Sequence, residues 1–306
     1  MRRPRALMPG DRVAIVAPAS PFDRERFDLG VAEIERFGLT PVITDGVFAR
    51  RGYVAGDARS RSAALTDAWR DPSIAALMVA RGGYGSAQVL PFLDPIVVQD
   101  AAKPFIGHSD LTAILVYLTT LCGTVCFHGP MVVNMARGEA GYDRDSFRRC
   151  LMTPAPVGEL TADGLETLRA GETSGPLLGG TLTQLVASLG TPYAFAPPSG
   201  YVLLLDEVGE RPYRIDRMLT QLVASGVLAR AAAVVCGELP DCDDPTGQPT
   251  ARGVVAELLE AFPGPVLFGF PTGHAAGPAL TVPLGVDVRV VGGRRPRLVV
   301  TESAVA

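Results

Sequence analysis

A histidine, a serine and an aspartate stand side by side in the stretch FIGHSDLTAILVYL, residues 105–118. The apolar residues before them are typical of a strand end, and those after them of an amphipathic helix. Ser109 would then lie on a tight strand-to-helix turn, where a nucleophilic serine has its hydroxyl raised above the sheet and the next backbone N–H can hold an oxyanion. The pattern GxSxG is incomplete because position 111 is Leu. The turn therefore fits a helix cap by Ser109 or Asp110 equally well.

A serine nucleophile needs a base, and the chain has three histidines: His108, His128 and His274. His108 is adjacent to Ser109, and adjacent side chains on a turn diverge, so it is poorly placed to accept the serine proton. His128 closes a short apolar run in CFHGP and is either a hydrogen-bonded strand-end residue or a pocket residue. His274 lies in a Gly/Pro-rich loop, FPTGHAAGPALTVPLG, which can present a side chain to a cleft. Taken alone, each histidine fits a structural role better than a catalytic one.

A carboxylate that orients the histidine would complete a triad. Asp206 and Glu207 end an apolar strand in YVLLLDEVGERPYRIDRMLTQL, and the alternation of side chains lets only one of them face a cleft. The alternative is that both acids are solvated at the strand end. Asp216 and Arg217 belong to the surface of the helix that follows.

A glycine-rich loop, RGGYGS at residues 81–86, follows the strand-like run AALMVA. Its glycines permit positive φ and close backbone approach, so the loop could bind phosphate or supply an N–H group to an oxyanion hole. The loop matches neither GxGxxG nor GxxxxGK[ST], which leaves a nucleotide site weakly supported.

Strand-like and helical patterns alternate through the first 135 residues. The strand-like runs are at residues 12–17, 41–44, 75–79 and 104–106, and the helical patterns at 24–37, 60–70, 86–92 and 111–121. This alternation predicts βαβ units and a doubly wound α/β domain with a mostly parallel sheet. In that architecture ligands gather beyond the carboxyl ends of the strands.

The sequence pattern of the second half predicts an α/β fold with more antiparallel strands. Residues 137–176 are polar, rich in Gly, Pro and Thr, and lack a clear period, so we expect a linker there. Helices are expected at 181–189 and 213–225, strands at 201–206, 232–236 and 266–268, and a hairpin around Gly292-Gly293.

Composition limits the class of protein. The chain has 306 residues, 47% of them hydrophobic, and a net charge of −4, which gives no basic surface for nucleic acid or anionic lipid. No run reaches the roughly 18 apolar residues of a membrane span, and the N-terminal run is too short for a secretion signal. The five cysteines form no CxxC pair, so neither a disulfide frame nor a zinc site is indicated. We expect a cytoplasmic protein with a small-molecule or peptide partner.

The order of these motifs along the chain resembles one family closely, the serine LD-carboxypeptidases, of the murein tetrapeptide carboxypeptidase and microcin C self-immunity types. The matching segments are GDRVAIVAPASP, RGGYGS, FIGHSDLTA, FHGPM, GPLLGGTLTQL, LLLDEVGERPYRIDRMLTQL and GHAAGPALTVPLG. They span nearly the whole chain.

The resemblance implies a Ser-Glu-His triad, with the serine at Ser109 and the histidine at His274. It implies an oxyanion hole from the N–H groups of Asp110 and Gly83, and no metal or cofactor. It also implies an N-terminal α/β domain (1–136) joined by the linker to a C-terminal domain (177–306) with a β-barrel-like sheet, and a homodimer. The usual triad glutamate is replaced by Asp206. Either Asp206 takes that role or Glu207 does, and we favour Asp206 because register hardly slips in a buried strand.

The implied activity is removal of the terminal D-alanine from murein tetrapeptides during cytoplasmic peptidoglycan recycling. Two alternatives stay open. One is a microcin-type peptidase that cleaves peptidyl or aminoacyl nucleotides, for which the single tryptophan, Trp69, offers no aromatic platform near the motifs. The other is a non-catalytic α/β ligand-binding module in which Ser109 only caps a helix.

Overall fold

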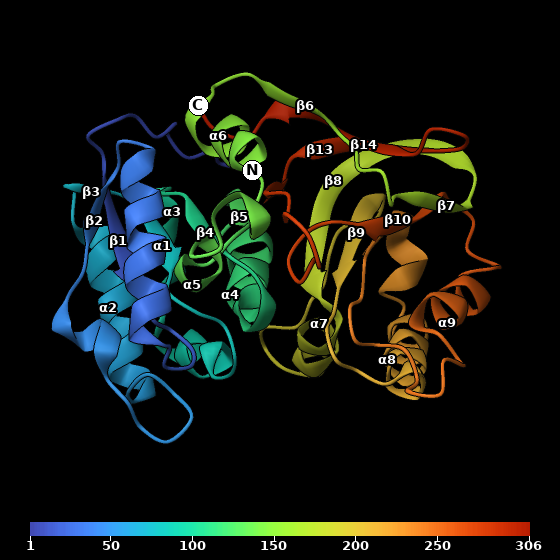
Figure 1. Ribbon diagram of the computed structural model, residues 1–306, viewed down its shortest axis with the longest axis horizontal. Coiled ribbons are helices and arrows are strands. Elements are labelled where there is room, and N and C mark those ends of the chain that lie inside the picture. The colour runs from blue at the N-terminus through green and yellow to red at the C-terminus, as the bar shows by residue number, and fades with distance from the viewer.

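The computed structural model describes residues 1–306 and contains two sheets, each packed against helices (Figure 1). The first sheet has six strands in the order β12-β5-β4-β3-β1-β2. All its pairs are parallel except β12 with β5. The strands are β1 (Arg12–Val16), β2 (Thr40–Val42), β3 (Ile74–Val79), β4 (Phe105–Gly107), β5 (Cys126–His128) and β12 (Val282–Leu284). The central strands are almost continuously apolar and buried, as a covered parallel sheet requires.

Acidic caps start the main helices of this half. Asp23, Asp57 and Asp94 each accept a hydrogen bond from a first-turn backbone N–H, at 2.9 Å in each case. The helices are α1 (Arg24–Arg36), α2 (Ala58–Arg70), α3 (Pro95–Ala101), α4 (Thr112–Val116) and α5 (Val132–Met135). The segment Ser86–Phe92, expected to be an ordinary helix, is a 3-10 helix and contains Pro91.

The second sheet has eight strands in the order β6-β14-β13-β8-β9-β10-β11-β7. Its central strands β8 to β11 are parallel, and the remaining strands pair antiparallel. The strands are β6 (Pro156–Leu160), β7 (Glu166–Arg169), β8 (Gly171–Thr181), β9 (Tyr201–Asp206), β10 (Ala231–Gly237), β11 (Val266–Phe270), β13 (Asp287–Gly292) and β14 (Arg297–Ser303). The helices of this half are α7 (Leu182–Ser188), α8 (Pro212–Ala224) and α9 (Ala251–Leu258).

The long β8 ribbon curves across the second half, so that the sheet curls (Figure 1). The edge strand β7 reaches the end of β13, where the Thr167 hydroxyl donates to the Gly293 carbonyl (3.0 Å) and the Gly293 N–H donates to the Thr167 hydroxyl (2.9 Å). The predicted fold class is confirmed: a parallel doubly wound half and a second α/β half with a barrel-like sheet.

Residues 137–176 are not the irregular segment that we expected. They contain helix α6 (Arg144–Met152), strands β6 and β7 and the start of β8. The two short strands lie in the outer part of the sheet, with exposed positions along each, so their composition stays polar and their period is weak. Strand β12 was also unexpected, because it comes from the C-terminal half and pairs with β5 of the first sheet.

The helix expected over residues 111–121 is divided into three turns. A 3-10 turn (Ser109–Leu111) leads into α4, and a π-helical turn (Tyr117–Leu121) ends it. The hydroxyls of Thr119 and Thr120 donate to the carbonyls of Leu115 (2.9 Å) and Val116 (2.6 Å). Such back-bonding competes with the regular helical ladder and accounts for the irregular end.

The two sheets meet where strands β4 and β8 end. The Thr181 N–H at the end of β8 donates to the Thr112 hydroxyl at the start of α4 (2.9 Å). Gly180 has φ +146°, and a Cβ there would lie 2.5 Å from the same hydroxyl. This close approach brings the turn after β4 next to the ends of β8 and β9.

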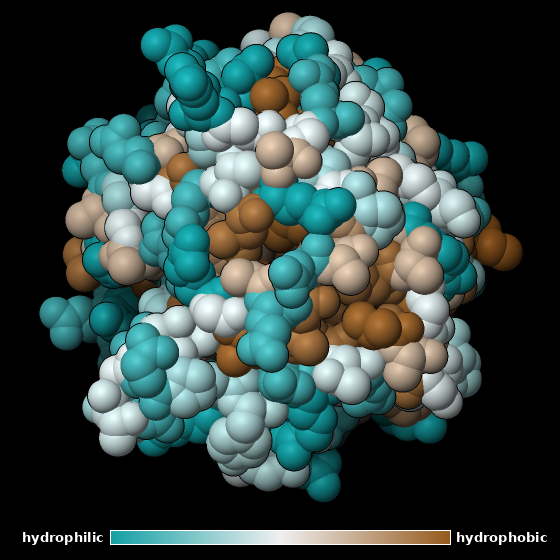
Figure 2. Space-filling view, turned by 90° about the vertical axis from the view of Figure 1, so that its right-hand side faces the viewer, coloured by the Kyte–Doolittle hydropathy of each residue, from teal (hydrophilic) through white to brown (hydrophobic).

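The helices α8 and α9 lie on the side of the molecule seen in Figure 2, where hydrophobic side chains surround a hollow. An apolar pocket between these two helices is lined by Val223, Leu228, Ala229, Leu258, Ala261 and Phe262. None of the helices combines the length and the apolar character needed to cross a bilayer.

Candidate active site

Ser109, His274 and Asp206 form one hydrogen-bonded chain. The Ser109 Oγ lies 3.0 Å from His274 Nε2, and His274 Nδ1 lies 2.7 Å from Asp206 Oδ2. The His274 backbone N–H also donates to Asp206 Oδ1 (3.2 Å), which fixes the loop on the carboxylate. The serine follows β4, the acid ends β9, and the histidine follows β11. His274 is 165 positions from Ser109 and 68 positions from Asp206 along the chain. The fold nevertheless brings the three together in the arrangement that a nucleophile, a base and an orienting acid require.

The backbone of Ser109 is strained. Its φ is +66°, in the left-handed region that residues other than glycine rarely adopt. Strain of this kind at a strand-to-helix turn is typical of a nucleophile whose hydroxyl is held above a sheet.

The helix-cap interpretation of this turn is wrong for both side chains. Ser109 Oγ bonds to His274, and Asp110 accepts hydrogen bonds from the Ser86 N–H (2.7 Å) and the Gln184 amide (3.2 Å). The Asp110 carboxylate therefore ties the glycine-rich loop and α7 to the serine turn.

The two acids at the end of β9 point to opposite sides. Asp206 faces His274, whereas Glu207 accepts from the Thr183 N–H (2.8 Å) and hydroxyl (2.6 Å) and from the Val208 N–H (3.0 Å). Only 1% of Asp206 and 4% of Glu207 is exposed, so the alternative of two solvated acids is wrong. Strand alternation selects Asp206 as the acid that contacts the histidine.

Burial alone would raise the pKa of Asp206, but the hydrogen bond and charge of His274 outweigh it and leave that pKa lowered. Burial likewise would lower the pKa of His274, but the bonded Asp206 carboxylate leaves it raised above 6.5. The carboxylate is therefore ionised at neutral pH and strengthens His274 as a base.

The other two histidines lie beside this chain. His108 Nδ1 donates to the Gly129 carbonyl (2.9 Å), and the ring meets the His274 ring edge to face at 5.1 Å between centroids. His108 therefore makes its hydrogen bond to Gly129 and not to Ser109. Burial lowers the pKa of His108 to about 3. His128 is completely buried and bonds to Thr272 (3.1 Å).

The glycine-rich loop lies against the serine. A Cβ at Gly82 would be 3.0 Å from Ser109 Cβ, and a Cβ at Gly83, where φ is +100°, would be 2.5 Å from Ser20 Oγ. The Tyr84 N–H donates to Ser20 Oγ (3.0 Å), which anchors the loop. The Gly83 N–H makes no hydrogen bond within the chain, so it is available to a ligand.

Some residues that shape the site were missed by sequence reasoning. Gly273 has φ +63°, and a Cβ there would lie 2.3 Å from Asp206 Oδ2. Ser20 donates to the Tyr53 carbonyl (2.8 Å) and accepts from Tyr84. The glycine directly before His274 in FPTGH was the one available signal, since only glycine tolerates both the positive φ and the close contact.

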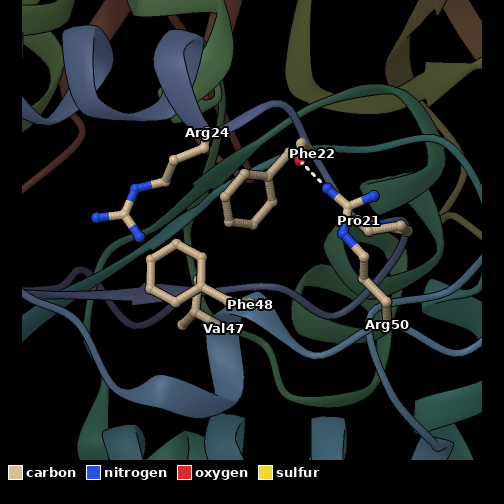
Figure 3. A pocket seen from close by; sticks show the side chains of 6 residues that line it. All are labelled: Pro21, Phe22, Arg24, Val47, Phe48 and Arg50. Carbon is tan, nitrogen blue, oxygen red and sulfur yellow. Dashed lines mark hydrogen bonds between the residues drawn. The ribbon is translucent and has the colours of Figure 1, made fainter.

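A pocket of ≈ 250 Å³ lies beside the loop, lined by Pro21, Phe22, Arg24, Val47, Phe48 and Arg50 (Figure 3). The Arg50 guanidinium donates to the Phe22 carbonyl (2.8 Å), and that of Arg81 donates to the Pro21 carbonyl (2.7 Å). Arg24 is paired with Asp28, but neither Arg50 nor Arg81 has a carboxylate partner. Two guanidinium groups without a carboxylate partner therefore lie at this pocket, Arg50 in its lining and Arg81 against Pro21.

Two family models match the chain. One describes the LD-carboxypeptidase N-terminal domain and matches residues 13–129, and the other describes the LD-carboxypeptidase C-terminal domain and matches residues 174–290. The chain belongs to the LD-carboxypeptidase family. This confirms the resemblance read from the motifs, and the family's carboxypeptidase names support a peptidase.

Individual relatives cover nearly the same length. A putative carboxypeptidase of Streptomyces coelicolor is 38% identical over 94% of this chain and 93% of its own. The murein tetrapeptide carboxypeptidase of Pseudomonas aeruginosa is 32% identical over 87% and 88%. The microcin C7 self-immunity protein MccF, solved in complex with aspartyl sulfamoyl adenosine, matches all of both chains with a TM-score of 0.89 and 22% identity. That last likeness shows the shared fold.

Proposed function

We propose that this member of the LD-carboxypeptidase family is a serine peptidase that removes the terminal D-alanine from murein tetrapeptides. The observation that carries the proposal is the hydrogen-bonded chain Ser109–His274–Asp206 at the junction of the two sheets. Relatives named for murein peptides, at 30% and 32% identity, support this substrate class.

In the first half of the reaction, Ser109 Oγ attacks the carbonyl carbon before the terminal D-alanine while His274 Nε2 takes its proton. Asp206 stabilises the resulting imidazolium and keeps Nδ1 as the donor. The carbonyl oxygen becomes an oxyanion, for which the N–H groups of Asp110 and Gly83 are the proposed donors. His274 then protonates the leaving amine, D-alanine departs, and an acyl-enzyme ester remains on Ser109.

In the second half, His274 takes a proton from water, and the hydroxide so formed attacks the acyl ester. The ester bond to Ser109 breaks, the serine recovers its proton from His274, and the shortened peptide leaves with a new carboxylate. In each half His274 accepts one proton and later gives one back, so the enzyme returns to its starting state.

Asp206 is the proposed triad acid, although the resemblance implies glutamate at this position. The short carboxylate still reaches His274 at 2.7 Å, and Gly273 lets the histidine loop approach it closely. Glu207, the alternative acid, is bonded to Thr183 and Val208 and makes no hydrogen bond to the histidine.

A second candidate function is cleavage of an aminoacyl or peptidyl nucleotide. Trp69 is buried against Phe105 and offers no platform for a base. However, Tyr84 of the glycine-rich loop beside the serine forms an exposed edge-to-face pair with Tyr53, 5.3 Å between centroids. An aromatic pair in that position could stack on a base.

Mass spectrometry of products separates these functions. The protein is incubated in parallel with a murein tetrapeptide and with a peptidyl adenylate analogue, using Ser109→Ala as the control. Loss of D-alanine from the tetrapeptide supports the proposed function, and cleavage of the adenylate alone favours the second candidate. A protein that binds but cleaves neither would be a ligand-binding module.

The proposed recycling role brings two further expectations, a cytoplasmic location and a homodimer. Cell fractionation tests the first, and analytical ultracentrifugation tests the second. Limited proteolysis would test the division into domains 1–136 and 177–306, because a junction between two separately folded domains should be cut before either domain.

A further inference from the structure

His128 is a buried imidazole beside the triad acid but outside the triad. It is the last residue of β5, and its side chain is 0% exposed. Its Nε2 has no hydrogen-bond partner and lies 3.8 Å from Asp206 Oδ2, the same oxygen that bonds to His274. A buried polar atom without a partner is costly, so its position calls for an explanation.

The hydrogen bonds on the other side of the ring fix its tautomer. The Thr272 hydroxyl donates to the Leu280 carbonyl (2.8 Å), which uses its single proton. Its oxygen can therefore only accept from His128 Nδ1, 3.1 Å away. The proton of His128 resides on Nδ1, and Nε2 faces Asp206 with a lone pair.

Burial keeps this ring uncharged, although the charge of Asp206 opposes that effect. His128 comes from β5, His108 from the end of β4, His274 from the loop after β11, and Cys236 from β10, while Glu207 faces away toward Thr183. Burial lowers the pKa of His128 to about 4. No three of the chain's His, Cys, Asp and Glu side chains are arranged to hold a metal ion, which removes ligation as a reason for the cluster.

The packing holds the ring in this place. Val282 of β12 pairs with His128 across the sheet, and a Cβ at Gly273 would lie 2.6 Å from His128 Cε1. The gap of 3.8 Å between Nε2 and Oδ2 is too short for a bridging water, because two hydrogen bonds of about 2.8 Å at a tetrahedral angle span about 4.6 Å. The ring therefore excludes water from that side of the carboxylate.

We propose that His128 is a positioning residue for the triad acid. Its Nε2 lies against Asp206 Oδ2, where it keeps other donors away and has no proton of its own to donate. Both hydrogen bonds that the buried carboxylate accepts come from His274. Its charge is consequently not shared with another donor, and the full effect falls on the basicity of His274.

The tautomer can be tested without reference to activity. Nitrogen-15 NMR of the histidine rings in the whole protein at neutral pH should show His128 with a protonated Nδ1 and an unprotonated Nε2. The variant Thr272→Val removes the acceptor of the Nδ1 proton and should move the proton to Nε2. A wild-type ring with a proton on Nε2, or one carrying both protons, would overturn the proposal.

The consequence for His274 rests on the proposed function and is measured as the pH dependence of kcat/KM. In Thr272→Val and in His128→Gln an N–H group faces the Asp206 carboxylate and stabilises its charge, so the acid limb of the profile should move down by about one pH unit. His128→Phe supplies no donor and should leave the acid limb in place.

Thr281→Val is the matched control, since this neighbouring threonine is fully buried and its hydroxyl has no hydrogen-bond partner. Its profile should coincide with that of the wild type. If Thr272→Val, His128→Gln and His128→Phe all lower the rate without moving the acid limb, the role of His128 is only structural. If the wild type cleaves no peptide, the proposed function fails while the NMR result still decides the tautomer.

Discussion

Asp206 and Glu207 provide a matched pair of substitutions that tests the assignment of the triad acid. Both acids are buried at the end of β9, and each can be replaced by its amide without a change of shape. Asp206→Asn removes the charge that accepts the 2.7 Å hydrogen bond from His274 Nδ1. The amide then favours the wrong tautomer of the imidazole, and Nε2 can no longer take the serine proton.

The expected loss in kcat for Asp206→Asn is about 10⁴-fold, equivalent to about 5.4 kcal/mol of transition-state stabilisation. Glu207→Gln keeps one carbonyl oxygen for its three donors on Thr183 and Val208. It should cost about 1–3 kcal/mol of folding stability but less than tenfold in kcat.

The assay is release of D-alanine from murein tetrapeptide, with thermal unfolding measured on the same samples. Equal rates for the two variants, or the larger loss in Glu207→Gln, would refute the assignment of Asp206. A parallel fall in rate and melting temperature for both would indicate that each acid acts only on folding.

Three further predictions concern other parts of the site. The pKa of His274 is raised above 6.5, and its base form is lost as pH falls through that pKa. The acid limb of kcat/KM should therefore have its midpoint above pH 6.5 in the wild type and below pH 6.5 in Asp206→Asn. A wild-type midpoint near pH 4 would contradict this. Gly273→Ala should lower kcat by about 100-fold, since the new Cβ would lie 2.3 Å from Asp206 Oδ2 and displace the histidine loop, and a fully active variant would show that the loop adapts. Arg50→Gln should raise KM several-fold for peptides with a free carboxylate but not for their amides, whereas the exposed Arg217→Gln should change neither.

The serine turn and the strand-end acids could be predicted because each depends on local pattern. An apolar strand followed by a helical period places Ser109 on the turn, and strand alternation separates Asp206 from Glu207. The observed contacts follow both rules.

Other parts of the structure depend on tertiary contacts that no local pattern contains. The tautomer of His128 is set by Thr272, 144 residues away, and by the carbonyl of Leu280. Strand β12 returns to the first sheet because it pairs with β5, although its sequence lies in the second half. Strands β6 and β7 within residues 137–176 were missed because their exposed positions weaken the apolar period.

The proposed mechanism requires Ser109 to form an acyl-enzyme. Wild-type protein and Ser109→Ala are mixed with murein tetrapeptide, quenched in acid within one turnover and analysed by peptide mass spectrometry. We expect a tripeptidyl adduct on the peptide that contains Ser109, with release of an equal amount of D-alanine, and neither product from the variant. Release of D-alanine by Ser109→Ala at a rate close to that of the wild type would contradict it.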